Sequence, residues 1–589
     1  MNGFLAVINL DGSAVDRDVL ARMSKEMQAR ACVRQETWVN GEAGFAVGWP
    51  DASTREVAVS GEITVLGDIR LDARQEIGVG AGELSDARVI AEAYRKWERG
   101  CVGHLLGDFA FVVFDSKRNE LLCARDHFGI KPLFYAVTKS ALIISNTIEC
   151  VIAHPEVSDE LNEIALADFL LFDHIQDTSA TSYRDVLRLP PAHLLTLNRG
   201  LKLERYWTLP TDCVTRFRSS SEYVEHYVEL LKVAVQDRVR DHARVAVMMS
   251  GGLDSTSVAA LAKAQGRDVA AFTLISEANG PDPEKRFSKI AADALGIPLV
   301  QHHQEAYQPF AGWDELPHRK PEPSMDLFPQ SGNDFFSKVA EFSPAALSGY
   351  GGDPGLYPSA EFVRKSLRSA KAISLLASSL LYVLRHGKLP NVGLRTALRR
   401  KGDPDPGRIP GWLNPEFVKQ CDLEERWVEA HRLTRVPETM RPEAYRVLMS
   451  PGWEQLFWLQ EAGFTGVPLE VRHPMFDLRV LKFLLGIPPI PWCVDKELLR
   501  VAMKDRLPKD IRFRPKTTAG TAVPVANGIA VGDLKRFGID PLIKQYVNSL
   551  PEEFLPSTQY ETWSTLRPWL LNLWLRKSRI RKTVESAEA

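Results

Sequence analysis

A glycine-rich turn between an apolar run and a helix-like stretch carries the clearest chemical signal in the chain. Residues 245–249 read Val-Ala-Val-Met-Met, and Ser250-Gly251-Gly252-Leu253-Asp254-Ser255 follows before an Ala- and Val-rich run. In a strand–turn–helix unit, glycines let the backbone approach a ligand, and the free N–H groups at the helix start bind an anion. Asp254 would repel phosphate, so it is expected to bind Mg²⁺. The sequence therefore predicts a phosphate site beside a metal-binding carboxylate.

A second turn, Leu347-Ser348-Gly349-Tyr350-Gly351-Gly352-Asp353, is also rich in glycine and also ends in a carboxylate. A lone turn of this kind is usually a plain loop, so its meaning depends on the first turn. The chain has no G-x-x-x-x-G-K-[ST] string, which excludes the common nucleotide-binding loop of ATPases.

Composition limits the possible classes of protein. A chain of 589 residues is too long for one hydrophobic core and suggests two to four domains. The net charge of −2 gives no electrostatic case for nucleic acid binding. The longest uncharged apolar stretch, Ala372–Leu384, is too short to span a bilayer, and residues 1–12 lack the features of a signal peptide. Seven scattered cysteines fit reduced thiols, so we expect a cytoplasmic protein without a zinc site.

Residues 1–207 show the pattern of a separate domain that contains two sheets covered by helices. A helix is expected at Asp86–Trp97, between β-type runs that are separated by Gly, Asp and Asn turn signals. The expected strands are Phe4–Leu10, Phe45–Val47, Val57–Val59, Ile63–Leu66, Phe109–Phe114 and Leu142–Ser145.

Several motifs show a resemblance to the asparagine synthetase superfamily. Residues 105–111 (LLGDFAF) and 125–135 (RDHFGIKPLFY) resemble its glutaminase domain, and residues 250–255 (SGGLDS) resemble the pyrophosphate loop of the ATP-pyrophosphatases. The resemblance covers nearly the whole chain. It implies an α+β N-terminal αββα sandwich of the Ntn-hydrolase type (class II glutaminase-like) over residues 1–207. An α/β ATP-pyrophosphatase-type synthetase domain on a parallel sheet would follow over residues 208–589.

The chain departs from the family at the glutaminase nucleophile. The family uses a cysteine that becomes N-terminal after Met1 is removed, and its own α-amine activates the thiol. Here position 2 is Asn2, and the nearest cysteine is Cys32. Asp86 remains at a matching acidic position. We therefore expect an inactive glutaminase-like domain, kept because the synthetase half packs on it rather than for a new binding role.

The resemblance implies a site for ATP and Mg²⁺ in the second half. The two turns would meet, and Asp254 and Asp353 would share Mg²⁺. The implied ATP-binding residues are Met248, Ser250, Gly251, Gly252, Leu253, Asp254, Ser255, Leu274, Ser348 and Gly349.

Tyr350 is the feature that separates this chain from asparagine synthetases, which carry Glu at that position. Tyrosine there is similar to β-lactam synthetases and to lasso-peptide cyclases, in which a tyrosine tuned by a nearby carboxylate takes a proton from the attacking amine. Counting back from Glu470–Asp477 gives Glu454 as the first candidate for that carboxylate and Glu461 as the second. Either glutamate could equally be a solvated helix residue.

Two lysines match basic motifs of the family. Lys516, within residues 512–520 (RFRPKTTAG), matches the catalytic lysine that neutralises the departing pyrophosphate and the tetrahedral intermediate. Lys496 is expected to anchor a phosphate or a helix.

Two segments lie outside this scheme. Arg364–Arg408 is dense in basic residues, and it is either a surface helical pair or a docking surface for a peptide or partner protein. The stretch Trp569–Lys582 is expected to form a terminal helix packed on the core, for which a membrane-surface role is possible but unneeded.

Together these features predict an ATP-dependent carbon–nitrogen ligase that forms AMP. It would adenylate an Asp or Glu side chain of a precursor peptide. The peptide's N-terminal amine would then form an amide with that side chain, which makes a lasso-type macrolactam. The resemblance also implies a leader peptidase and a leader-binding partner protein. A β-lactam synthetase-like enzyme for a small molecule, an ammonia-dependent asparagine synthetase and a catalytically silent scaffold remain as alternatives.

Overall fold

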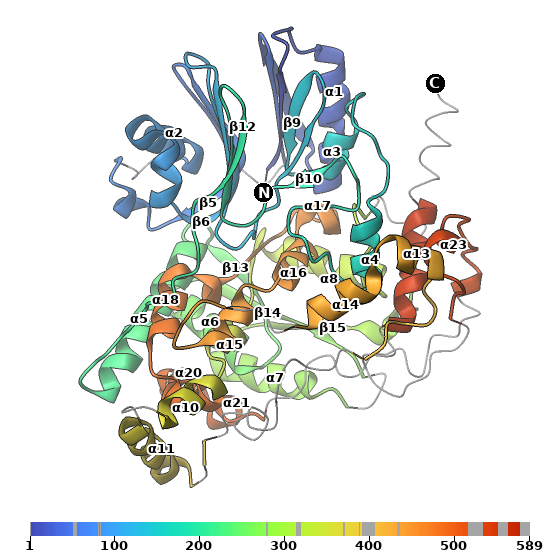
Figure 1. Cartoon of the computed structure of the whole chain (residues 1–589). Coiled ribbons are helices and arrows are strands. Elements are labelled where there is room, and N and C mark those ends of the chain that lie inside the picture. Colours follow the sequence, from blue (N-terminus) through green and yellow to red (C-terminus); the bar gives the residue numbers. More distant parts are fainter. Residues whose placement is uncertain are drawn as a thin grey trace.

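The computed structural model describes residues 2–50, 56–80, 82, 84–277, 281–313, 320–368, 372–387, 389–390, 407–432, 436–515, 534–551 and 564–577. Within these residues, two antiparallel sheets form the N-terminal half and one parallel sheet forms the centre of the C-terminal half (Figure 1). The expected fold class, an αββα sandwich followed by an α/β unit, is confirmed. No helix of this part of the chain is long and apolar enough to cross a bilayer.

The two N-terminal sheets pack face to face through alternating apolar side chains. Phe4 and Phe45 of one sheet meet Val112 and Phe114 of the other in a common core. The outer faces are covered by α1 and α3 on one side and by α2 on the other. The first sheet runs in the order β10 (Leu187–Arg188), β8 (Phe134–Val137), β9 (Ala141–Ser145), β1 (Gly3–Asn9), β3 (Ala43–Trp49), β2 (Arg34–Asn40). The second runs β12 (Leu201–Arg205), β11 (His193–Leu197), β7 (Glu120–Arg125), β6 (Leu106–Asp115), β5 (Ile63–Asp72), β4 (Val57–Ser60). The helices of this half are α1 (Arg17–Lys25), α2 (Asp86–Trp97), α3 (Ile148–Ile152) and α4 (Glu163–Phe172).

The parallel sheet is buried on both faces, as the apolar composition of its strands requires. Val245 and Val247 of β13 face α5, α6 and α7, whereas Ala246 faces α8. Its order is β15 (Leu299–His303), β14 (Asp268–Ile275), β13 (Arg244–Met248), β16 (Ala345–Leu347), β17 (Glu470–Arg472). The covering helices are α5 (Ser220–Val239), α6 (Leu253–Ala264), α7 (Pro283–Leu295) and α8 (Pro329–Phe342).

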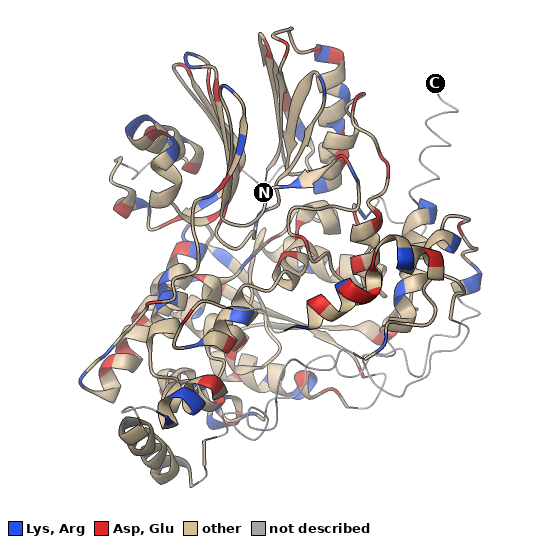
Figure 2. Ribbon diagram, in the orientation of Figure 1, with Lys and Arg blue, Asp and Glu red and all other residues tan. Residues whose placement is uncertain are grey.

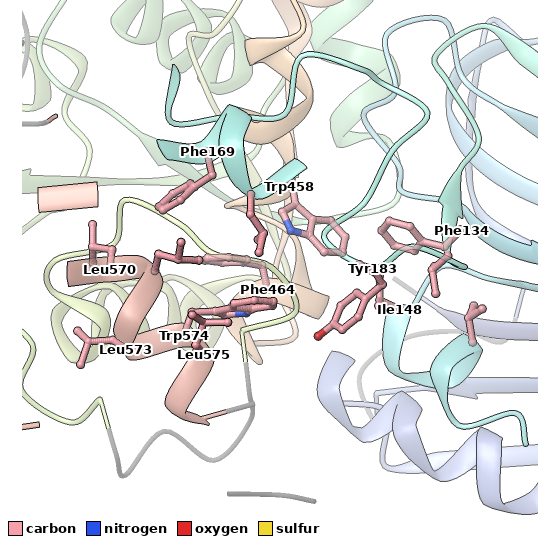
Figure 3. Packing of buried hydrophobic residues seen from close by; sticks show 14 of the residues in the cluster. Phe134, Ile148, Phe169, Tyr183, Trp458, Phe464, Leu570, Leu573, Trp574 and Leu575 are labelled. Carbon is pink, nitrogen blue, oxygen red and sulfur yellow. The ribbon is translucent and has the colours of Figure 1, made fainter. Parts of the chain in front are cut away.

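Shorter helices complete the C-terminal half. Of the terminal helix expected at Trp569–Lys582, residues 578–582 lie outside the described residues; a helix is present over residues 564–577, and its Trp569 and Trp574 are each 1% exposed. Figure 3 shows Trp574 among side chains from both halves, including Tyr183 and Phe464. The remaining elements are α9 (Gly352–Gly355), α10 (Ala360–Leu367), α11 (Ala372–His386), α13 (Pro415–Gln420), α14 (Leu423–His431), α15 (Pro442–Leu448), α16 (Gly452–Trp458), α17 (Ala462–Thr465), α18 (Leu478–Gly486), α19 (Pro489–Trp492), α20 (Glu497–Ala502), α21 (Lys509–Arg512) and α23 (Ile543–Tyr546).

Candidate active site

The first glycine-rich turn joins β13 to α6 at the carboxyl edge of the parallel sheet. Gly251 has a φ of +70°, a conformation that L side chains rarely adopt. The Gly252 N–H donates to Ser250 Oγ at 3.2 Å, and no side chain caps the start of α6. An N-terminal helix end of this kind, which follows a glycine turn, is the usual position for binding phosphate. Met248 ends β13, and Leu274 lies near the end of the neighbouring β14.

The second glycine-rich turn follows β16 and packs directly on the first. A side chain at Gly349 would place its Cβ 2.7 Å from the Ser255 backbone nitrogen, and one at Gly352 would place it 2.5 Å from Asp254 Cγ. Ser348 Oγ lies 2.6 Å from His473 Nδ1, which fixes the base of this turn. The structure thus brings together the two predicted turns, and glycine is required where they touch.

Asp254 and Asp353 lie close enough to share one cation. The ammonium group of Lys496 lies 2.8 Å from Asp353 Oδ1 and also forms an ion pair with Asp254. Burial opposes the charged form of Lys496, but the two carboxylates together outweigh it and raise its pKa. Lys496 therefore binds the two predicted metal ligands in this structure.

The donor set fits Mg²⁺, because carboxylate oxygens are its preferred ligands and one monovalent cation already bridges them. No cluster of three or more His, Cys, Asp or Glu side chains suited to a metal occurs among the described residues. An ion held by Asp254 and Asp353 would therefore take its other ligands from water and from the phosphates of a bound nucleotide.

Tyr350 lies on the second turn, between aromatic neighbours. Its ring stacks on His473 with a centroid separation of 5.7 Å and an interplanar angle of 7°, and Trp453 meets it edge-on at 6.1 Å. Burial raises the pKa of Tyr350, and a hydrogen bond with the Gln460 side chain acts in the opposite direction. Gln460 was not among the residues expected at the site, and its partner is visible only in three dimensions.

Glu454 contacts different groups from those expected. The Glu454 carboxylate forms ion pairs with Arg125 and with Arg188, the latter at 3.6 Å. The physical reason is helical geometry: Trp453 directs its ring to Tyr350, and the next residue of α16 points about 100° away, towards the N-terminal half. The expectation that Glu454 partners Tyr350 is therefore corrected.

The second candidate, Glu461, also holds the two halves together. It pairs with Arg30 Nη2 at 2.6 Å and with Lys131 Nζ at 3.8 Å. Lys131 also pairs with Glu470 at 2.9 Å. Removing one member of such a buried pair is strongly destabilising, because it leaves an uncompensated charge. These ion pairs between Arg30 or Lys131 and the glutamates give the N-terminal half a role in packing against the C-terminal half.

Lys516 lies outside the described residues. Arg514, two positions earlier, is described, and its Nη1 donates to the Ser250 carbonyl oxygen at 2.8 Å. Its guanidinium also lies 4.6 Å from the centre of the Phe287 ring. The basic motif therefore reaches the first glycine-rich turn, and Arg514 is a contact residue that sequence reasoning did not single out.

The position of the missing nucleophile is buried. Asn2 is 1% exposed, and its carbonyl oxygen accepts a hydrogen bond from Asn146 Nδ2 at 2.7 Å. Burial raises the pKa of the nearby Cys32 thiol, so this cysteine is not activated. Asp86 accepts from the Leu71 N–H at 2.9 Å and pairs with Arg240.

A groove with a volume of about 1250 Å³ opens between the halves. Its lining includes Phe172 and His174 from the N-terminal half, and Tyr445 and Met449, from α15 and the residue after it, from the C-terminal half. Tyr445 belongs to the hydrophobic cluster that also includes Tyr350. None of the described residues that line the groove belongs to the two glycine-rich turns.

Two family models match the chain. A glutamine amidotransferase domain matches residues 51–207, and asparagine synthase matches residues 226–549. Asparagine synthetase [glutamine-hydrolyzing] 3 of Bacillus subtilis is 31% identical over 210 residues, which is 36% of this chain and 34% of that protein. Amidase chry2 of Gibberella zeae is 30% identical over 38% of this chain and 35% of its own length. The matched stretch thus spans about a third of these curated relatives. A putative asparagine synthetase [glutamine-hydrolyzing] of Mycobacterium bovis is 26% identical over 87% of this chain and 85% of its own.

Proposed function

The chain belongs to the asparagine synthase family, and on that premise we propose that it is an ATP-dependent ligase that forms an amide within a precursor peptide. A carboxylate is a poor electrophile, so an oxygen of an Asp or Glu side chain of the peptide first attacks the α-phosphorus of ATP. The bond to pyrophosphate breaks, and an acyl-adenylate results. The peptide's N-terminal amine then attacks the acyl carbon, AMP leaves with the bonding electrons, and the nitrogen loses a proton.

The two glycine-rich turns support the nucleotide-binding part of this proposal. The uncapped start of α6 provides N–H groups for phosphate, and Asp254 and Asp353 provide oxygens for Mg²⁺. A bound Mg²⁺ would neutralise phosphate charge. Lys516 is proposed to stabilise the pyrophosphate that leaves, and Arg514 ties the start of that segment to Ser250.

The placement of Tyr350 is the observation that carries the proposal of an amine nucleophile. Its phenol lies on the turn that bears Asp353, stacked on His473 and hydrogen bonded by Gln460. We propose that Tyr350 handles the proton of the attacking amine. A Gln460 N–H donated to the phenol oxygen would stabilise the phenolate, which replaces the role first expected of Glu454.

One observation favours an amine of the substrate over ammonia from glutamine: Asn2, at the position where the resemblance places the glutaminase cysteine, has no nucleophilic side chain. A second observation favours a large substrate: the groove of about 1250 Å³ is larger than the roughly 300–1,000 Å³ of ordinary small-ligand pockets. A leader peptidase that frees the amine, and a leader-binding protein that delivers the precursor, are the partners we propose.

The test is mass spectrometry of the purified protein with ATP, Mg²⁺ and linear peptides that carry a free N-terminal amine and an Asp or Glu side chain. We expect a core peptide lighter by one water together with an equal amount of AMP, and no product from Asp353→Ala. Asp505→Ala removes an exposed carboxylate elsewhere and is the matched control.

Other outcomes would identify the alternatives. AMP release driven by aspartate plus ammonia would favour an ammonia-dependent asparagine synthetase. AMP release driven by a small β-amino acid would favour a β-lactam synthetase-like enzyme. Absence of any ATP turnover would leave the scaffold interpretation.

A further inference from the structure

Helix α11 has two apolar faces, and only one of them is covered. Leu375 and Tyr382 are 7% and 1% exposed and pack with Ile490 and Val494. On the other face the exposed fractions are large for apolar side chains: Ile373 80%, Leu376 63%, Leu380 59% and Leu384 73%. At 3.6 residues per turn these four side chains fall within an arc of about 80°, opposite Tyr382. They form a continuous apolar stripe, which we call the α11 stripe.

The α11 stripe lies at the edge of the molecule. Figure 1 shows α11 projecting beyond α10 and α20, at the end of the C-terminal half that is far from the N-terminal sheets. No Lys, Arg, Asp or Glu occurs from Ala372 to Leu384, and α11 is tan in Figure 2. A contiguous exposed apolar surface of this kind marks an interaction site rather than ordinary surface.

The surroundings of the stripe are basic. Arg364, Lys365 and Arg368, at the end of α10 and just after it, are exposed. Among the described residues from Arg364 to Leu384, these three are the basic ones, and none is Asp or Glu. An apolar helix face beside clustered basic residues is complementary to a surface that is apolar inside and anionic outside.

The composition of the stripe argues against a protein surface, including a second copy of the chain, as the occupant. The stripe contains only Ile and Leu, whereas the residues that dominate protein–protein binding energy are chiefly Trp, Tyr and Arg. An anionic lipid surface matches both the apolar stripe and the exposed Arg364 and Arg368 at the end of the neighbouring α10.

We propose that the α11 stripe and the end of α10 bind an anionic lipid surface. The helix Ala372–His386 has 15 residues, too few to span a bilayer, which takes about 20. It would therefore lie in the plane of the interface, with its leucines among the acyl chains and the arginines of α10 at the headgroups.

Contact with lipid would place the candidate site close to the membrane. Tyr382, on the covered face of α11, donates a hydrogen bond to Asp495 Oδ2 at 3.1 Å. The next residue is Lys496, which pairs with Asp353. The proposed surface is thus joined to the site by one side-chain contact.

The test is binding of the full chain to vesicles, measured by co-sedimentation without ATP, so that its outcome is independent of the ligase proposal. Vesicles that contain phosphatidylglycerol should bind at least about tenfold more tightly than pure phosphatidylcholine, and high salt should reduce the difference. Leu376→Glu with Leu380→Glu should abolish binding. Arg364→Gln with Arg368→Gln should weaken binding to the anionic vesicles by about thirtyfold.

The matched control is Leu201→Glu with Leu203→Glu, which changes two exposed leucines of β12 and should leave vesicle binding unchanged. Equal binding to the two kinds of vesicle, or no binding to either, overturns the proposal. If the α11 double variant instead converts a dimer to a monomer in sedimentation velocity, without vesicle binding by the original chain, the stripe is an interface between copies and the lipid proposal is wrong.

Discussion

The ammonium group of Lys496 lies 2.8 Å from a carboxylate oxygen of Asp353, and the same ammonium pairs with Asp254. One cation thus joins three segments that are far apart in the sequence. Lys496 reaches this position from a backbone with a φ of +56°, and Asp495 before it has a φ of +51°. Two successive non-glycine residues in the left-handed region cost energy, which is typical of functional sites.

Loss of the Asp353 carboxylate should stop catalysis without unfolding the protein. Its side chain is 51% exposed, so Asp353→Asn removes a charge that packing does not require. We expect ATP turnover to fall by at least about a hundredfold, since one electrostatic contact at a reacting phosphate has that effect. AMP release measures the activity, and thermal denaturation should show an unchanged midpoint. A variant with normal AMP release would remove Asp353 from the site.

Glu454→Gln should act on stability rather than on chemistry. Glu454 is 6% exposed and pairs with Arg125 and Arg188, so the substitution leaves the buried Arg125 without its countercharge, while Arg188 keeps Glu322. The expected loss is about 3–5 kcal/mol of unfolding free energy. Urea denaturation measures it. A large fall in kcat with unchanged stability would restore Glu454 as a catalytic candidate.

Tyr350→Phe should act on chemistry rather than on stability. The phenyl ring keeps the stacking on His473 and Trp453, while the hydroxyl is lost. We expect the rate of amide formation to fall by about 10²–10⁴-fold, the usual contribution of a positioned acid–base group. Single-turnover measurements should show adenylation retained and the amine step slowed. An equal loss in both steps would contradict the assigned role.

Gly349→Ala should disrupt the contact between the two turns. The added methyl would lie 2.7 Å from the Ser255 nitrogen, which is backbone and must shift. We expect ATP turnover to be lost and stability to fall by about 1–3 kcal/mol. The control is Gly332→Ala in α8, where no atom lies within 4 Å of the new Cβ. That change should stabilise the helix by about 0.5–1 kcal/mol.

Acid should destabilise the protein through His473. Burial lowers its pKa from 6.5 to about 3, so the unfolded state binds a proton at pH values where the folded state does not. Stability from this group is complete above pH 6.5 and is lost as the pH falls from 6.5 towards 3. The urea midpoint of His473→Asn should therefore fall less than that of the original chain between pH 7 and pH 5. Equal falls would mean that His473 does not contribute.

Much of the fold followed from local patterns. The helix expected at Asp86–Trp97 is α2 with the same bounds, and the apolar run before Ser250 is the central strand of the parallel sheet. Arg34–Asn40 and Leu201–Arg205 were missed as strands. Both lie at sheet edges, with few or no buried side chains, so they lack the apolar alternation that identifies a strand.

The sequence by itself determined the two glycine-rich turns, because the requirement for glycine depends only on the backbone conformation of a few neighbouring residues. It also determined that Asn2 is no nucleophile. Only the tertiary structure decided which charged groups meet. Lys496 and Asp254 are 242 positions apart, and Glu454 and Arg125 are 329 apart. A long charged side chain can extend in several directions, so the sequence does not show which group it meets. Its partner depends on which segments lie together when the two halves pack, because a charge buried without a partner is costly.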